Sequence, residues 1–132
     1  DPEEALKFYK ETGVDTLAGS FGTIHGIAKM TGLAEPHVDV ERIKKVHDLV
    51  NIPLVLHGAS GVPPEIISEA IKAGVAIINI DTELRVSFSS ALRQSLLENP
   101  NEVDPRHIFK PVMAAVQATA VKKLKEFNTQ LI

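Results

Sequence analysis

Two histidines stand at the ends of apolar runs, and each is followed directly by a glycine. His25 precedes Gly26, and His57 closes the apolar run 54–56 and precedes Gly58. Neutral imidazole is a common zinc ligand, and a catalytic zinc uses three protein ligands with one position left open. Because both histidines occupy the same place after a strand, we expect His25 and His57 to reach one metal ion. The alternative is that each ring is a structural group hydrogen-bonded to a nearby carbonyl.

A loop of small residues, Gly58-Ala59-Ser60-Gly61, follows the second histidine. Small residues let backbone N–H groups approach an anion, and the start of the next helix adds a favourable dipole end. A phosphate oxygen could accept hydrogen bonds from these amides and from the Ser60 hydroxyl. The alternative is an ordinary tight turn before a helix that begins at a proline.

A third polar group, Asn79-Ile80-Asp81-Thr82, follows another apolar run. In an extended chain Asn79 and Asp81 share one side, while Ile80 points to the other. Asp81 or Thr82 could simply cap the helix that follows, whereas an amide at the end of an apolar strand needs a polar partner. Arg85, one helical turn after Asp81, either pairs locally with that aspartate or contacts a second anionic group.

The elements that must position these groups alternate between helices and strands. Apolar periodicity and cap residues predict helices over 2–12, 40–50, 63–73, 82–97 and 104–127, and strands over 14–18, 53–56 and 75–80. Such alternation predicts a parallel sheet covered by helices, an α/β fold. Three strands are few for such a sheet, and a helix comes first, so we expect the last part of a larger barrel.

Three further expectations concern the helices. Pro111 should interrupt the last helix near Lys110. Lys122, Lys123 and Lys125 should form a solvated helix end that complements the helix dipole. In the helix before it, four apolar residues should share one stripe: Leu84, Phe88, Leu92 and Leu96.

Composition excludes several classes of protein. With 132 residues, 44% of them hydrophobic and 23% charged, the chain is typical of a globular protein. A net charge of −3 provides no basic field for nucleic acid, and no apolar stretch approaches the roughly 20 residues of a membrane span. Zero cysteines leave histidine and carboxylate as metal ligands. The acidic opening lacks a signal peptide, and we expect a cytoplasmic location.

Taken together, these segments resemble the class II, zinc-dependent fructose-bisphosphate aldolases. The stretches that carry the resemblance are TGVDTLA at 12–18, GTIHG at 22–26, PLVLHGASG at 53–61, INIDTELR at 78–85 and DPR at 104–106. The family has a (β/α)8 barrel. The resemblance therefore implies that residues 1–132 are the C-terminal part of one barrel domain, with its last three strands, and that the N-terminal part is absent.

The resemblance also implies roles for individual residues. His25 and His57 look like two of three zinc ligands, and Asn79 like the residue that holds the enediolate of dihydroxyacetone phosphate. The carbonyls around Gly26, Gly58 and Ser60 look like a site for a monovalent cation, sodium or potassium. Arg85 resembles the arginine that reaches the far phosphate of the sugar, across a dimer interface. The cradle for the substrate's near phosphate would comprise Gly26, Gly58, Ala59, Ser60, Ile80, Asp81 and Thr82.

The implied activity is the reversible aldol cleavage of fructose 1,6-bisphosphate to dihydroxyacetone phosphate and glyceraldehyde 3-phosphate. This chain lacks the family's Asp-His pair, which holds the acid/base and the third zinc ligand, and also its mobile-loop glutamate. We therefore expect the chain to be inactive alone. The segment 28–38 also departs from the family pattern, because it is longer than the family's usual loop after the first histidine. We expect the missing part of the barrel to be a partner of this chain, and the full-length protein to form homo-oligomers. We expect no binding to nucleic acid or to a membrane.

Three alternatives remain. A tagatose-bisphosphate aldolase would share the zinc and phosphate sites, but its relatives tend to lack the acid at Asp81 and the arginine at Arg85. A metal-free phosphate-binding module would use the histidines structurally. An engineered or proteolytic fragment, kept for folding or assembly, would have no function of its own.

Overall fold

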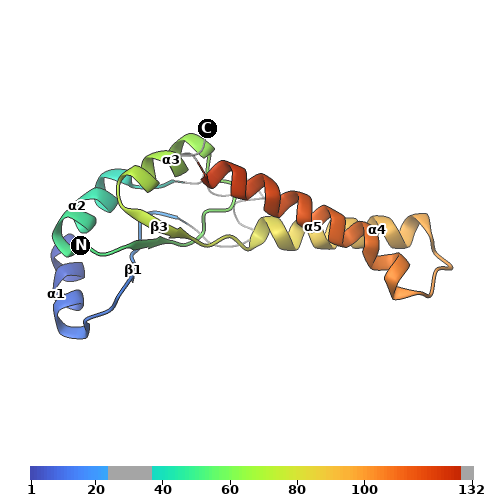
Figure 1. The fold of residues 1–132 in the computed structure, drawn as a ribbon, viewed down its shortest axis with the longest axis horizontal. Coiled ribbons are helices and arrows are strands. Elements are labelled where there is room, and N and C mark those ends of the chain that lie inside the picture. Colours follow the sequence, from blue (N-terminus) through green and yellow to red (C-terminus); the bar gives the residue numbers. More distant parts are fainter. Residues whose placement is uncertain (24–36, 129–132) are drawn as a thin grey trace. The chain divides into compact units, whose positions relative to one another are not determined.

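The computed structural model describes residues 1–23 and 37–128, and the chain divides into two compact units. The first, Asp1–Ile80, contains α1 (Pro2–Thr12), β1 (Leu17–Ala18), α2 (Val40–Val50), β2 (Leu54–Leu56), α3 (Pro64–Lys72) and β3 (Val75–Ile78). The second, Asp81–Ile132, contains α4 (Thr82–Glu98) and α5 (Pro105–Phe127) (Figure 1). Among the described residues, no helix is long and apolar enough to cross a membrane.

The three strands form one parallel sheet in the order β1-β2-β3. This confirms the predicted α/β architecture with three parallel strands. The strands are shorter than predicted: 14–16, 53 and 79–80 lie outside them. β2 has only three residues, so it limits how far its neighbours can pair. At its start, the N–H of Leu17 donates to the carbonyl of Pro53 at 3.1 Å. A register shift between Leu54 and Val55 leaves one extra residue, Ala76, on β3.

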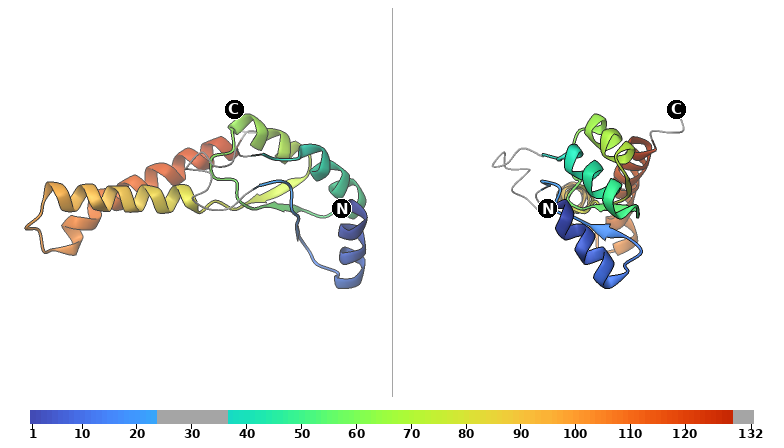
Figure 2. Two further views of the ribbon diagram at one scale, coloured as in Figure 1. Left: turned by 180° about the vertical axis from the view of Figure 1, so that it is seen from behind. Right: turned by 90° about the vertical axis from the view of Figure 1, so that its left-hand side faces the viewer.

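Helices α2 and α3 pack on one face of the sheet (Figure 2), as expected when both crossovers are right-handed. The predicted apolar face of α2 is buried at Ile43, Val46 and Val50. Leu54 and Leu56 of β2 are also fully buried. The core of this unit therefore lies between the sheet and these two helices.

Local capping explains where the first helices begin and end. The Asp1 carboxylate accepts a hydrogen bond from the N–H of Glu3 at 2.8 Å, and Gly13 ends α1 with a φ of 64°. Asp39 caps α2 through the N–H of Arg42, and Asn51 ends it in the left-handed region. Each of these residue types is favoured at its position, so these helix bounds were predictable from the sequence.

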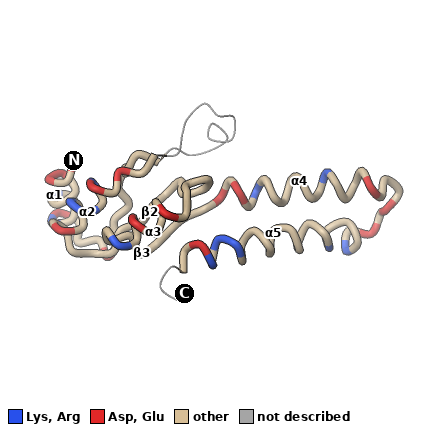
Figure 3. Tube along the Cα trace, turned by 90° about the horizontal axis from the view of Figure 1, so that it is seen from above, with Lys and Arg blue, Asp and Glu red and all other residues tan. Residues whose placement is uncertain are grey.

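Helices α4 and α5 form an antiparallel hairpin (Figures 1 and 3). The predicted interruption at Pro111 is wrong, because α5 continues through it. A proline removes one backbone donor and loosens the preceding turn. Here the buried hydroxyl of Ser95 on α4 donates to the carbonyl of Ile108 at 2.9 Å, and Val112 is buried beside the proline. These two tertiary contacts stabilise the helix across that turn.

The predicted apolar stripe on α4 is not buried. Phe88 and Leu96 remain 42% and 46% exposed, and Ser95 is the buried residue of that helix. Phe88 stacks on Phe109 of α5 with ring centroids 6.3 Å apart. This hairpin therefore buries much less apolar surface than the sheet unit.

Candidate functional site

Two predicted site residues lie side by side where β2 and β3 end. Leu56 pairs with Ile78, and the N–H of Asn79 donates to the carbonyl of Leu56 at 3.0 Å. His57 and Asn79 are therefore the next residues in register, and in a parallel sheet such neighbours project from the same face. Main-chain pairing alone thus brings these two side chains together at the carboxyl edge of the sheet.

The side chains of this pair make contact. Nδ2 of Asn79 lies 3.3 Å from Nδ1 of His57, and both residues are exposed. The amide nitrogen can only donate, so in this contact Nδ1 of His57 is the acceptor. The partner that the sequence required for the Asn79 amide is therefore the histidine itself.

The second predicted metal ligand, His25, and its neighbour Gly26 lie outside the described residues. Within residues 1–23 and 37–128, no group of three or more His, Asp or Glu side chains is placed to hold a metal ion. His57 is an exposed imidazole and fits the donor set of zinc as a single ligand. A metal on Nε2 would leave the ring proton on Nδ1, so the Asn79 amide would have to present its oxygen instead. A metal on Nδ1 would displace that amide.

The loop after His57 is a tight turn with a buried centre. Gly58 and Gly61 adopt φ values of 63° and 74°, and the N–H of Val62 donates to the carbonyl of Ala59 at 3.1 Å. Ala59 is 1% exposed and Ser60 8%. No side chain accepts a cap hydrogen bond at the start of α3, where Pro63 occupies the cap position. This backbone is compatible both with an ordinary tight turn and with a loop that binds phosphate.

The start of α4 carries an ion pair. Asp81 is the N-cap residue, yet its side chain makes no cap hydrogen bond, so that predicted alternative is wrong for its carboxylate. Oδ1 accepts instead from Nε of Arg85 at 2.6 Å, which is the predicted local pair. Both side chains are exposed, and Thr82 begins the helix. Ile80 closes the first unit, and Asp81 opens the second.

A buried lysine that the sequence analysis misplaced links the two helices of the hairpin. Lys123 is 7% exposed, and its Nζ lies 2.8 Å from carboxylate oxygens of both Glu83 and Glu126. Burial lowers the pKa of Lys123, but the hydrogen bonds to Glu126 and Glu83 outweigh it and hold the pKa above its ordinary value. The predicted solvated lysine run is therefore wrong at this position. Helical spacing was the available signal, because Val112, Val116 and Lys123 share one face.

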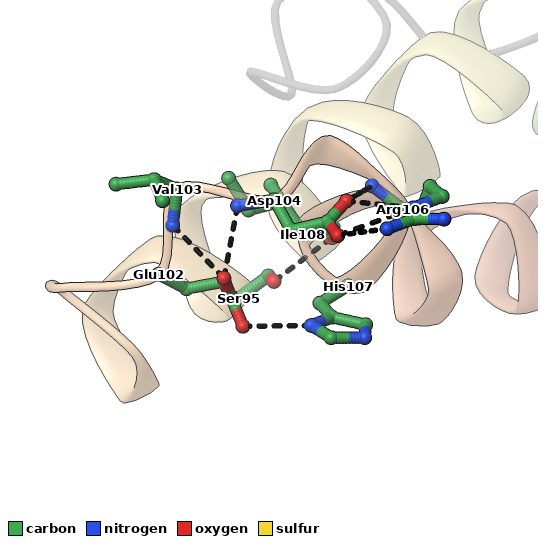
Figure 4. Close-up of polar contacts among 7 residues, drawn as sticks. All are labelled: Ser95, Glu102, Val103, Asp104, Arg106, His107 and Ile108. Atoms are coloured by element: carbon green, nitrogen blue, oxygen red, sulfur yellow. Dashed lines mark hydrogen bonds and ion pairs between the residues drawn. The ribbon is translucent and has the colours of Figure 1, made fainter.

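A capping cluster surrounds the DPR segment that precedes α5 (Figure 4). Asp104 accepts from the N–H of Arg106 at 2.9 Å and pairs with its guanidinium at 2.6 Å. These hydrogen bonds lower the pKa of Asp104. Glu102 accepts from the N–H of Asp104, then faces Nδ1 of His107 at 2.9 Å, and both contacts lower its pKa. His107 has a structural role here, through its contact with Glu102.

Fold and site together define an α/β protein whose polar residues gather where parallel strands end. Residues 1–130 match the family model for class II fructose-bisphosphate aldolase. The chain is 41% identical over 129 residues to a fructose-bisphosphate aldolase of Geobacillus stearothermophilus, covering 98% of this chain and 44% of the relative. The chain belongs to the class II fructose-bisphosphate aldolase family.

Solved structures agree with this assignment. The YdjI aldolase of Escherichia coli K12 is 37% identical, with a TM-score of 0.75 over 99% of this chain and 45% of that one. A fructose-bisphosphate aldolase of Campylobacter jejuni shares the fold at 22% identity, with a TM-score of 0.78 over 97% and 44%. The chain thus spans less than half the length of the relatives it matches. Its fold is that of three strands of the family's barrel, as predicted.

Proposed function

We propose that this chain supplies three strands and part of the active site of a zinc-dependent aldolase that cleaves fructose 1,6-bisphosphate. The carrying observation is the contact between His57 and Asn79, held at the carboxyl edge of the sheet by main-chain pairing. Family membership supports the same activity. In this proposal the strands that the chain lacks come from the remainder of the barrel, in one domain.

The acid/base of the remaining barrel part would take the proton of the substrate's hydroxyl, whose oxygen forms the aldehyde carbonyl as the neighbouring carbon–carbon bond breaks. The electron pair of that bond goes to the ketone half, as an enediolate. His25 and His57 would hold zinc together with a third histidine from the remainder of the barrel. The chemistry that zinc supplies when bound is Lewis-acid polarisation of the substrate carbonyl. The amide of Asn79 donates a hydrogen bond toward the oxygen on which negative charge develops, which lowers the barrier.

The two phosphates of the substrate have separate partners in this proposal. Backbone N–H groups of Gly58-Ala59-Ser60, with Gly26, Ile80, Asp81 and Thr82, would hold the phosphate of the dihydroxyacetone half and so orient the bond that breaks. Arg85 would bind the far phosphate, because a guanidinium has five N–H donors and Nε alone faces Asp81. The Asp81–Arg85 pair favours fructose over tagatose as the sugar. The monovalent cation, the homo-oligomer and the cytoplasmic location stay predictions.

Replacing Asn79 tests the proposed mechanism in the protein that joins this chain to the remainder of the barrel. Asn79→Ala should lower kcat by about 100-fold or more, since one donor to a developing oxyanion is worth that much. Zinc content, measured by atomic emission, should stay near one per barrel. Asn101→Ala, at an exposed position, serves as the control and should leave kcat and the zinc content unchanged. An unchanged kcat for Asn79→Ala would contradict the role of the amide.

The isolated 132-residue chain should show no aldol cleavage, because neither a third zinc histidine nor the acid/base aspartate is identified in it. Coupled assays with added zinc, compared with the completed barrel, measure this directly. Appreciable turnover by the chain alone would contradict the proposal. Phosphate binding without any zinc in the completed barrel would favour the metal-free module instead.

A further inference from the structure

The buried lysine of the hairpin neutralises a carboxylate in the first turn of α4. Nζ of Lys123 bridges Glu83 on α4 and Glu126 on α5 at 2.8 Å each, and Glu83 is 28% exposed. Glu126 has a second lysine, Lys122, at 3.8 Å, whose side chain is 74% exposed. Two lysines therefore balance two glutamates, and charged residues gather at the start of α4 and at the end of α5 (Figure 3).

Glu83 occupies a sensitive position, because it lies in the first turn of α4 directly after Asp81 and Thr82. The N-terminus of a helix attracts anions through its N–H groups and its dipole. An uncompensated carboxylate in that turn would satisfy the helix end itself and repel a phosphate dianion nearby. The side chain of Lys123 holds the Glu83 carboxylate toward α5 and cancels its charge.

We propose that Lys123 is a positioning residue, which keeps the start of α4 receptive to the substrate's phosphate by neutralising and retaining Glu83. The inference rests on the proposed function, since it needs a phosphate at Asp81 and Thr82. It assigns a role to a residue that touches neither substrate nor metal. It also explains why a lysine is buried between two helices that bury few apolar side chains.

The experiment compares four variants of the completed barrel: Lys123→Met, Lys122→Met, Glu83→Gln and the double variant of Glu83→Gln with Lys123→Met. Steady-state kinetics with fructose 1,6-bisphosphate, calorimetric titration with inorganic phosphate, and thermal unfolding are measured on each. Lys123→Met should raise KM and the phosphate Kd by about tenfold, as expected for one unscreened charge nearby, with kcat within about twofold. The double variant should return KM to the value for Glu83→Gln alone. Lys122→Met removes the same charge from the exposed side and should leave KM unchanged.

Several results would overturn the inference. A double variant with the same raised KM as Lys123→Met would show that neutralising Glu83 is not what Lys123 does. An equal rise in KM for Lys122→Met would reduce the effect to net charge. If Lys123→Met does not fold, the double variant is compared with Glu83→Gln alone. KM values of these two variants that differ by more than about threefold would contradict the inference.

The same series separates this inference from the proposed function. If the unmodified protein cleaves no sugar bisphosphate but binds phosphate, the proposed function fails, and the phosphate Kd values still decide the role of Lys123. If the unmodified protein binds no phosphate, both proposals fail.

Discussion

The two units of this chain are stabilised by different kinds of contact. Among the described residues, every buried apolar side chain except Val112 lies in the sheet unit, Asp1–Ile80. The helical hairpin instead buries the polar residues Ser95 and Lys123, each hydrogen-bonded or ion-paired to the opposite helix. Its large apolar residues remain exposed, among them Leu97, Val103, Met113 and Leu124.

The difference bears on how each unit positions its part of the proposed site. In the sheet unit, backbone register places His57 beside Asn79, and an apolar core maintains that register. In the hairpin, side-chain links at both ends of α4 determine how it lies against α5. Substitutions should therefore affect the sheet through packing and the hairpin through individual polar contacts.

The largest effect is expected in the sheet core. Leu54→Ala removes a fully buried side chain from β2 and should lower the free energy of unfolding by about 2–5 kcal/mol. The matched control in the hairpin, Leu97→Ala, removes the same atoms from a residue that is 76% exposed. It should change the free energy of unfolding by less than about 0.5 kcal/mol. Denaturant unfolding followed by circular dichroism measures both. Equal losses would contradict the contrast between the units.

A smaller loss is expected at Gly74, between α3 and β3. Its φ is 119°, and an added Cβ would collide with the His47 ring. Gly74→Ala should therefore cost about 2–4 kcal/mol, through strain and overpacking together. Gly13→Ala is the control, because its φ is 64° with no atom within 4 Å of the added Cβ, and about 1 kcal/mol is expected. Comparable unfolding midpoints for the two variants would show that His47 moves aside without cost.

In the hairpin, Ser95→Ala removes the donor to the Ile108 carbonyl. The loss should be about 1–2 kcal/mol, since a part-buried acceptor is left without that bond. Amide exchange should accelerate around Pro111, because the contact stabilises that turn of α5. Ser90→Ala, on an exposed position of the same helix, should leave both stability and exchange unchanged. No change in exchange for Ser95→Ala would assign the continuity of α5 to Val112 alone.

The smallest effect concerns acid. The pKa of Glu102 lies below its ordinary 4.5 in the folded chain, through the backbone hydrogen bond from Asp104 and then the contact with His107. Its stabilising contribution is therefore complete above about pH 4.5 and is lost as the pH falls through the lowered pKa. Carboxyl NMR titration should show the depressed midpoint, with faster exchange of the Val103 and Asp104 amides below it. Glu102→Gln should abolish this acid-dependent step, and a step that persists would assign it elsewhere.

Where caps and apolar periodicity were strong, the sequence predicted the elements closely. Asp1, Gly13 and Asn51 mark helix ends that the structure confirms. The prediction failed at Pro111 and at Lys123, and both failures have one cause. Local rules predict a break at Pro111 and a solvated side chain at Lys123. In the structure a side chain of α4 contacts α5 at each place, and local pattern carries no information about that helix.

The sequence by itself determined that polar residues, His57 and Asn79 among them, lie near the ends of parallel strands and hence at one edge of the sheet. That inference needs only the period of an extended chain and the shared direction of parallel strands. Only the tertiary structure decided that Asn79 is the partner of His57, which nitrogen of His57 faces the amide, and that Lys123 is buried against Glu83. These contacts depend on distances between atoms on different residues and elements, which residue order and periodicity do not specify.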